Sequence, residues 1–135
     1  MSVDPQELGN GETPAGARAS IAEAISREMV LLQKQFGGRG PTECKTFIHR
    51  DLVLVMFGGG YTAAEQTLYE AGKWIDVRQM RIAFQDTMEL RFSAKIEELT
   101  GREVVAFMSA NHQNPDLALE VFVLQPLPVA AAAAS

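Results

Sequence analysis

The residues best suited to chemistry lie on one predicted helix and in one glycine run. Arg81 and Gln85 are four positions apart, so they share a face of that helix. The glycine run 58–60 precedes another predicted helix, whose free backbone N–H groups could attract an anion. Arg81, Gln85, Gly59 and Gly60 therefore form a candidate binding site for a small anion such as bicarbonate.

Simpler structural roles compete with this site. The glycine run lacks the lysine and hydroxyl of a Walker motif and the full glycine spacing of a dinucleotide site. A turn with unusual backbone dihedral angles is therefore its favoured interpretation. For Arg81 the favoured interpretation is a solvated helix face with ion pairs. Glu120 interrupts an apolar strand and is expected to face solvent or to pair with a base.

Metal and catalytic sites find little support. His49 and His112 fall at two predicted strand connections, but a metal site needs more ligands and Cys44 is the single cysteine. We interpret both histidines as surface turn residues and Cys44 as a small packing residue. No metal and no cofactor is predicted. No catalytic arrangement can be recognised, so the chain is predicted not to be an enzyme.

The elements that must position these residues begin with a long amphipathic helix over 76–99. Asp76 is expected to cap its start and Gly101 to lie just past its end. Capping boxes beginning at Ser20 and Thr62 predict two further helices. Apolar residues at spacings of three and four define the buried stripes. They are Val77, Met80, Phe84, Met88, Phe92, Ile96 and Leu99 on the long helix, and Ile21, Ile25, Met29, Leu32 and Phe36 on the first.

Four β-rich runs predict strands, at 43–49, 52–57, 103–110 and 117–124. The order helix, glycine stop, strand, polar turn and apolar strand occurs twice, which resembles a duplicated unit. We therefore predict an α+β fold of duplicated helix–β-hairpin units. They form a four-stranded, mainly antiparallel sheet with helices on one face and one long central helix.

Length and composition set the domain organisation. We predict a flexible tail over 1–17, a single domain over 18–125 and a disordered Pro/Ala tail over 126–135. The net charge of −5 gives no general attraction to nucleic acid, which is not predicted as a partner. One cysteine and no visible secretory signal predict a cytoplasmic protein. No apolar run approaches ~20 residues, so no membrane span is predicted.

The apolar strands also predict an interface. The second strand of each predicted hairpin is rich in Val, Leu and Phe, and the helices offer limited cover. We expect one sheet face to remain exposed, and a large exposed apolar face usually becomes an interface. A two-fold homodimer is the simplest way to cover it.

Five short stretches carry a resemblance to a known bacterial family through their order and spacing. They are 38–41 (GRGP), 61–65 (YTAAE), 81–84 (RIAF), 100–102 (TGR) and 120–124 (EVFVL). Over about residues 20–125 the chain resembles the MpsC family, formerly a bacterial domain of unknown function. The family is named after the third component of a Na⁺-translocating membrane-potential-generating system.

The resemblance implies a soluble accessory protein linked to a membrane system for cation and inorganic-carbon uptake. The leading hypothesis is an accessory or regulatory protein that acts through protein–protein contacts, with membrane transporter subunits as candidate partners. The alternatives are a sensor domain for a small anion or a nucleotide, and an enzyme of unrecognised class. The resemblance assigns no active-site residue, so Arg81 and Glu65 remain candidates only.

Overall fold

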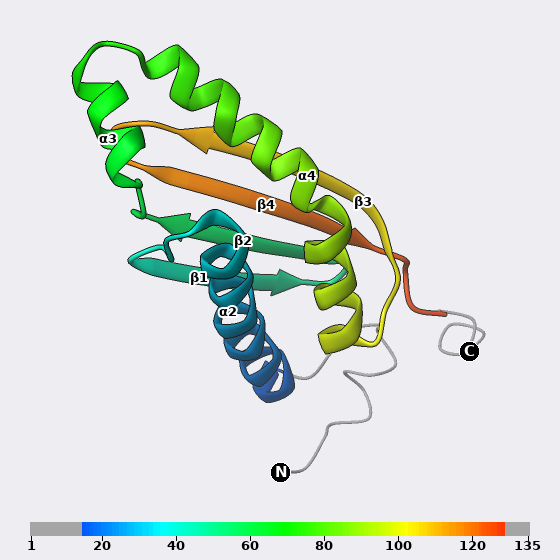
Figure 1. Cartoon of the computed structure of the whole chain (residues 1–135). Helices are drawn as coiled ribbons and strands as arrows, with labels where there is room; N and C mark the ends of the chain where they lie inside the picture. Colours follow the sequence, from blue (N-terminus) through cyan, green and yellow to red (C-terminus); the bar gives the residue numbers. More distant parts are fainter. Residues whose placement is uncertain (1–14, 129–135) are drawn as a thin grey trace.

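The computed structural model describes residues 15–128, which form an α+β fold with one antiparallel sheet. The elements are α2 (Ala15–Gly37), β1 (Glu43–His49), β2 (Leu52–Gly58), α3 (Ala63–Glu70), α4 (Trp74–Thr100), β3 (Val104–His112) and β4 (Leu117–Leu124). Figure 1 shows α2 and the long helix α4 lying across the same face of the sheet, with α3 at one end. The predicted fold class is confirmed.

The strand order is β1-β2-β4-β3, with every neighbouring pair antiparallel. The order places the second strand of each hairpin at the centre and the first strand of each at an edge. Two helix–hairpin units related by an approximate two-fold axis between β2 and β4 would give this order. The architecture thus agrees with the predicted duplication, with α3 inserted between the two units.

The core lies between the sheet and the two long helices. Alternate residues of a strand point to opposite faces, so only one face of β2 and β4 meets the helices. The rings of Phe57 and Phe92 meet there with centroids 6.3 Å apart. The buried side chains of the core are Ile25, Met29, Val53, Val55, Phe57, Met88, Phe92, Ile96, Phe122 and Leu124.

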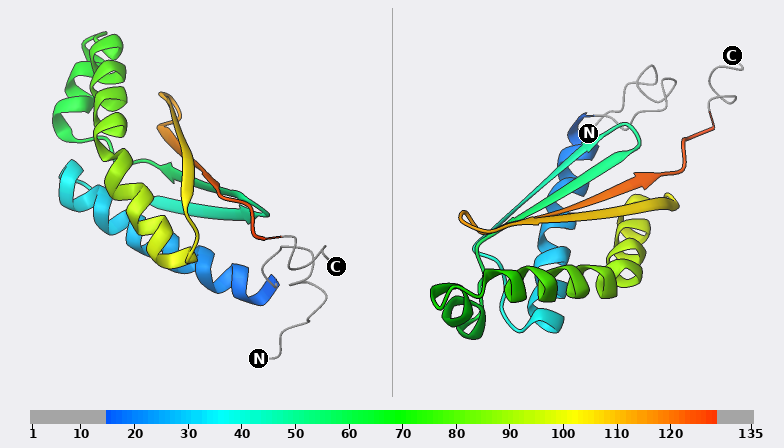
Figure 2. Two further views of the ribbon diagram at one scale, coloured as in Figure 1. Left: turned by 90° about the vertical axis from the view of Figure 1, so that its right-hand side faces the viewer. Right: turned by 90° about the horizontal axis from the view of Figure 1, so that it is seen from above.

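No described element covers the other face of the sheet, which we call the open face. The left view in Figure 2 shows both long helices on one side of the strands. One register row across this face joins Phe47, Leu54, Val121 and Met108. Phe47 is 56% exposed and Met108 is 54% exposed at the two edges. The remaining apolar side chains of the two central strands on this face are Leu52, Met56, Leu117, Leu119 and Val123.

Several predicted element ends are confirmed and others are wrong. Gly101 ends α4 in the left-handed conformation, with φ of 71°. However, α4 begins at Trp74 after the N-cap residue Lys73, so Asp76 lies in the first turn and is not the cap. The negative charge of its carboxylate still interacts favourably with the positive end of the helix dipole.

The first helix also begins earlier than predicted. Because α2 begins at Ala15, Ser20 lies inside the helix and its predicted capping box is wrong. Residues 15–17 of the predicted tail are therefore helical. The rest of that tail and residues 129–135 of the predicted C-terminal tail lie outside the described residues. Further along the chain, β3 runs from Val104 to His112, whereas the predicted strand covers 103–110.

Two residues predicted to lie in the buried stripes are instead exposed. Met80 is 50% exposed and Phe36 is 42% exposed. Both residues border a cavity between the helices, so the core does not enclose them. Hydrophobic periodicity identifies the apolar side of a helix but not how far along that side the sheet reaches.

Candidate functional site

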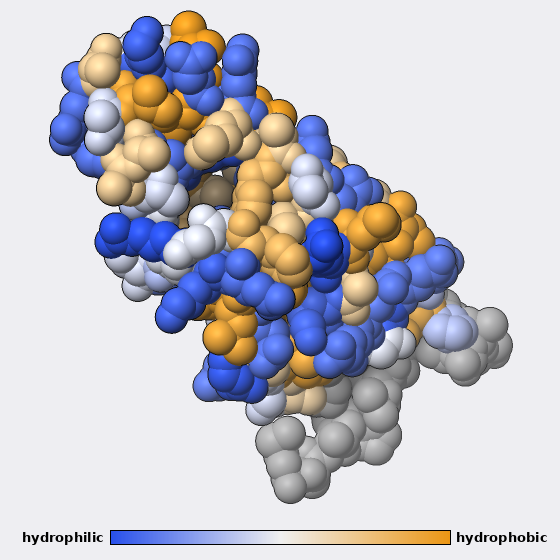
Figure 3. Space-filling view, viewed as in Figure 1, coloured by the Kyte–Doolittle hydropathy of each residue, from blue (hydrophilic) through white to orange (hydrophobic). Residues whose placement is uncertain are grey.

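A cavity of about 260 Å³ opens between the end of α2, the glycine turn after β2, α3 and the first half of α4. Figure 3 shows a hollow on the helix side of the molecule in this region, beside hydrophobic residues of α4. The structure brings all four residues of the candidate anion site to this one cavity. They are Arg81, Gln85, Gly59 and Gly60.

The glycine turn has a structural reason to contain glycine. Gly59 and Gly60 have φ values of 75° and 98°, in a region that side chains disfavour. A Cβ on Gly59 would clash with the Thr42 hydroxyl, and one on Gly60 would lie 3.1 Å from the Pro41 Cα. The turn interpretation of these glycines is confirmed. The turn also forms one wall of the cavity.

Arg81 joins three segments that are far apart in the sequence. Its Nε lies 3.0 Å from Oε2 of Glu65 on α3, and its guanidinium also pairs with Asp116 before β4. The guanidinium carbon lies 4.3 Å from the ring centroid of Tyr61. The ion pairs expected for Arg81 are present, but the expected solvated face is wrong, because this side chain is only 14% exposed.

The same contacts determine the electrostatics around Arg81. Burial alone would lower the pKa of Arg81, but hydrogen bonds to Asp116 and Glu65 outweigh it and raise the pKa. Glu65 is held in turn by the predicted capping box, in which Thr62 N–H donates to its Oε1 at 2.9 Å. One guanidinium thus faces two carboxylates. Their combined charge disfavours a free anion beside Arg81.

Glu120 is the largest departure from expectation at this site. It was expected to face solvent or to pair with a base, but it is 1% exposed and hydrogen-bonded to neutral groups. The Ser109 hydroxyl donates to Oε1, and Gln85 Nε2 donates to Oε2 at 2.9 Å. Burial raises the pKa of Glu120 to about 7, although both hydrogen bonds act to lower it. The side chain is buried because it points to the helix side of the sheet, like Phe122.

Gln85 and Asn111 complete this polar end of the cavity. Gln85 Nε2 also donates to the Ala110 carbonyl at 3.1 Å, and Asn111 Nδ2 donates to Gln85 Oε1 at 3.2 Å. The other amide atom of Asn111, Oδ1, is buried and has no hydrogen-bond partner among the described residues. Asn111 was missed at the sequence level, where it belonged to a turn-rich connection with no chemical signature.

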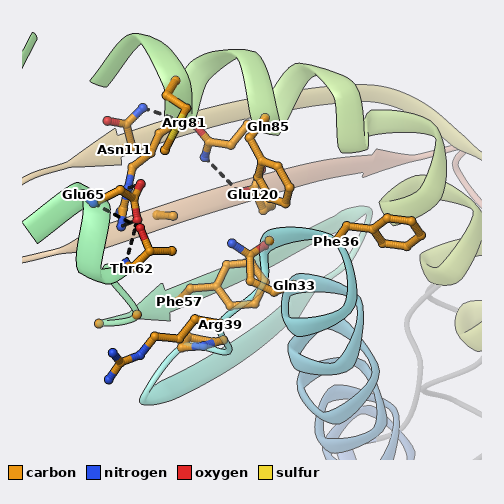
Figure 4. Close-up of a pocket in the computed structure, with 17 residues that line it drawn as sticks. Gln33, Phe36, Arg39, Phe57, Thr62, Glu65, Arg81, Gln85, Asn111 and Glu120 are labelled. Atoms are coloured by element: carbon orange, nitrogen blue, oxygen red, sulfur yellow. Dashed lines mark hydrogen bonds and ion pairs between the residues drawn. The ribbon is translucent and has the colours of Figure 1, made fainter. Parts of the chain in front are cut away.

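The rest of the cavity wall is largely apolar. Figure 4 shows Phe57 and Gln33 between the Glu65–Arg81 pair and the end of α2. The guanidinium of Arg39 points away from the labelled polar groups. The other apolar wall residues include Pro41, Met80, Phe84 and Ala118. An apolar wall with a few convergent polar groups is typical of a small-molecule binding site.

The remaining candidate residues lie elsewhere. His49 and His112 are exposed, as interpreted, but they are the last residues of β1 and β3 and not turn residues. His112 Nδ1 lies 2.9 Å from the Pro115 carbonyl oxygen. Among residues 15–128, no three His, Cys, Asp or Glu side chains gather as a metal site would require. Cys44 packs against the core as interpreted, and burial raises the pKa of its thiol despite a hydrogen bond with Ser26.

Comparison with known proteins places this chain in a family. The family model described as Na⁺-translocating membrane potential-generating system (MpsC) matches residues 17–126. The chain belongs to the MpsC family. No curated protein and no solved structure matches it. Among the described residues of this MpsC chain, no helix combines the length and apolar character needed to cross a membrane.

Replacing Arg81 with methionine should destabilise the domain by about 3 kcal/mol, because two nearly buried carboxylates lose their common partner. Arg78→Met is the matched control, since Arg78 is exposed on the same helix. The control should change the free energy of unfolding by less than about 0.5 kcal/mol. Urea denaturation measures both, and equal effects would contradict the structural role of Arg81.

Glu120→Gln should change how stability depends on pH. The folded protein holds the Glu120 proton up to pH about 7, whereas the unfolded chain releases it near 4.5. Raising the pH through this window therefore favours unfolding, by up to roughly 3 kcal/mol. The Glu120→Gln variant should lack this pH-dependent loss of stability. Its free energy of unfolding, relative to that of wild type, should therefore rise between pH 5 and 8.

Urea denaturation across the pH series measures the effect. Glu89→Gln provides the control, because Glu89 is exposed on α4 and outside the cavity. The effect of Glu120→Gln is compared with that of this control at each pH. A difference between Glu120→Gln and wild type that does not change with pH would show that the buried carboxyl does not titrate in this window.

Proposed function

We propose that this MpsC chain is a non-enzymatic accessory component of a membrane Na⁺-translocating system, acting from the cytoplasm through protein–protein contacts. The family supports the link to the membrane system. The observation that carries the proposal is the open face, because a soluble domain rarely leaves such an apolar surface in water without a partner. We further propose that the first occupant of this face is a second copy of the chain.

The distribution of side chains on the open face supports an interface. Its two central strands present only apolar side chains and one glycine there. Charged and polar side chains lie at its margin, where Glu43, Lys45 and His49 follow the β1 edge and His112 ends β3. An apolar centre with a polar rim is the usual anatomy of a protein interface.

The size of the face suits a dimer. Four strands of seven to nine residues cover roughly 20 by 25 Å at the normal strand spacing and rise. The corrugated side-chain surface is larger than this flat area, and a standard interface buries roughly 800 Å² per partner. Two such sheets can pack face to face about 10 Å apart, as in β-sandwiches. A two-fold axis lets the same patch serve both copies.

If two chains pack through their open faces, placing charged residues on that face should make the protein monomeric. The double variant Phe47→Lys/Met108→Lys should be monomeric at micromolar concentration, where the wild type is dimeric, because four lysines would meet across the interface. Leu90→Lys is the control, since Leu90 is 82% exposed on α4 on the helix side. It should remain dimeric. Sedimentation velocity measures all three, and a monomeric wild type would contradict the dimer.

The link to the membrane system has its own test. The purified chain should co-sediment with membranes that contain the integral subunits of the Na⁺-translocating system. It should stay in the supernatant with membranes from cells that lack those subunits. Equal recovery with both membranes, or with neither, would contradict the accessory role. The outcome does not depend on the dimer measurement.

A further inference from the structure

We propose that the cavity between α2, α3 and α4 binds a small amphipathic amine. The ammonium group would lie at the Glu120–Asn111 end, and the apolar body would lie against Phe57 and Phe84. This inference does not rest on the proposed membrane role or on the dimer.

The charges around the cavity favour a cation. The carboxylates of Glu65 and Asp116 share the single guanidinium of Arg81. Glu120 lies at the other side of the polar end, and among residues 15–128 it has no basic partner. Arg39 also lines the cavity, but it is exposed and its guanidinium points away from the labelled polar groups (Figure 4). A positive ligand would therefore give the ionised Glu120 a partner that the described part of the chain does not supply.

The hydrogen-bonding groups favour a ligand that donates. Both hydrogens of Gln85 Nε2 are used, by the Ala110 carbonyl and by Glu120. The Ser109 hydroxyl donates to Glu120 as well. Asn111 Oδ1 is a buried acceptor to which no described residue donates. Each carboxylate oxygen of Glu120 accepts one hydrogen bond from the described residues and can accept another. An ammonium group has three N–H donors and no acceptor.

The walls and the volume of the cavity limit the polarity and the size of the rest of the ligand. Phe57, Met80, Phe84 and Pro41 offer an apolar surface, and aromatic faces also attract cations. A volume of about 260 Å³ lies near the lower limit of small-molecule sites. The ligand class is therefore a small primary amine with one ring or a short alkyl body, rather than a nucleotide.

Three probes of nearly equal shape test the proposal, namely phenethylamine, 2-phenylethanol and phenylacetate. They differ mainly in a positive, neutral or negative head. Titrations at pH 8 followed by ¹H–¹⁵N NMR should show the amine binding at least tenfold more tightly than the acid. The side-chain NH₂ signals of Gln85 and Asn111 should shift with the amine. Tighter binding of phenylacetate, or no shift with phenethylamine at millimolar concentration, would overturn the proposal.

Two variants assign the effect to the proposed group. Glu120→Gln should weaken phenethylamine binding at least tenfold and leave 2-phenylethanol binding nearly unchanged. Glu89→Gln, on the exposed side of α4, should leave the affinities of all three probes unchanged. Unchanged amine binding in a folded Glu120→Gln protein would also overturn the proposal, because the carboxyl would then have no role.

Discussion

Two helices can cover only one face of a four-stranded sheet, and most features of this molecule depend on that constraint. The helices α2 and α4 lie on the same side, where they bury one set of side chains from β2 and β4 (Figure 2). The opposite set is equally apolar and has no cover among the described residues. Hydrophobic burial is the main favourable term in folding, so this face has a strong tendency to acquire a partner.

The covered side is not uniformly apolar, and its polar groups lie where the packing of the helices leaves space. Arg81 fixes α3 and the connection before β4 to α4 through Glu65 and Asp116. Beside this cluster, Glu120 and Gln85 form a second buried polar group. Buried polar groups are stabilising only when they are satisfied. These two clusters therefore hold α3 and α4 in a defined position beside the cavity.

Much of the architecture could be predicted from local patterns. β-rich apolar runs and turn residues located the strands, and the order of the elements indicated the paired hairpins. The Thr62–Glu65 capping box was visible because its chemistry is local. Helix starts were less predictable, since Ser20 lies inside a helix that begins at Ala15. A favourable cap does not prevent a helix from beginning earlier.

The site was harder to predict because its residues meet only through the fold. The types and spacing of the candidate residues predict a site, and the structure places all four around one cavity, namely Arg81, Gln85, Gly59 and Gly60. Their partners Asn111, on β3, and Asp116, just before β4, are more than twenty residues away in the sequence. The burial of Glu120 depends on which face of β4 meets the helices. Its alternation with Phe122 and Leu124 contained this information, but only a known core face could reveal it.

Intermolecular NOE measurements would test the interface at the open face most directly. A mixed sample would pair chains carrying labelled methionine methyl groups with unlabelled chains. Met56 and Met108 lie on the open face, whereas Met80 is exposed on the helix side. A face-to-face dimer predicts contacts between chains at Met56 and Met108 and none at Met80. Contacts at Met80 alone, or no contacts at all, would contradict it.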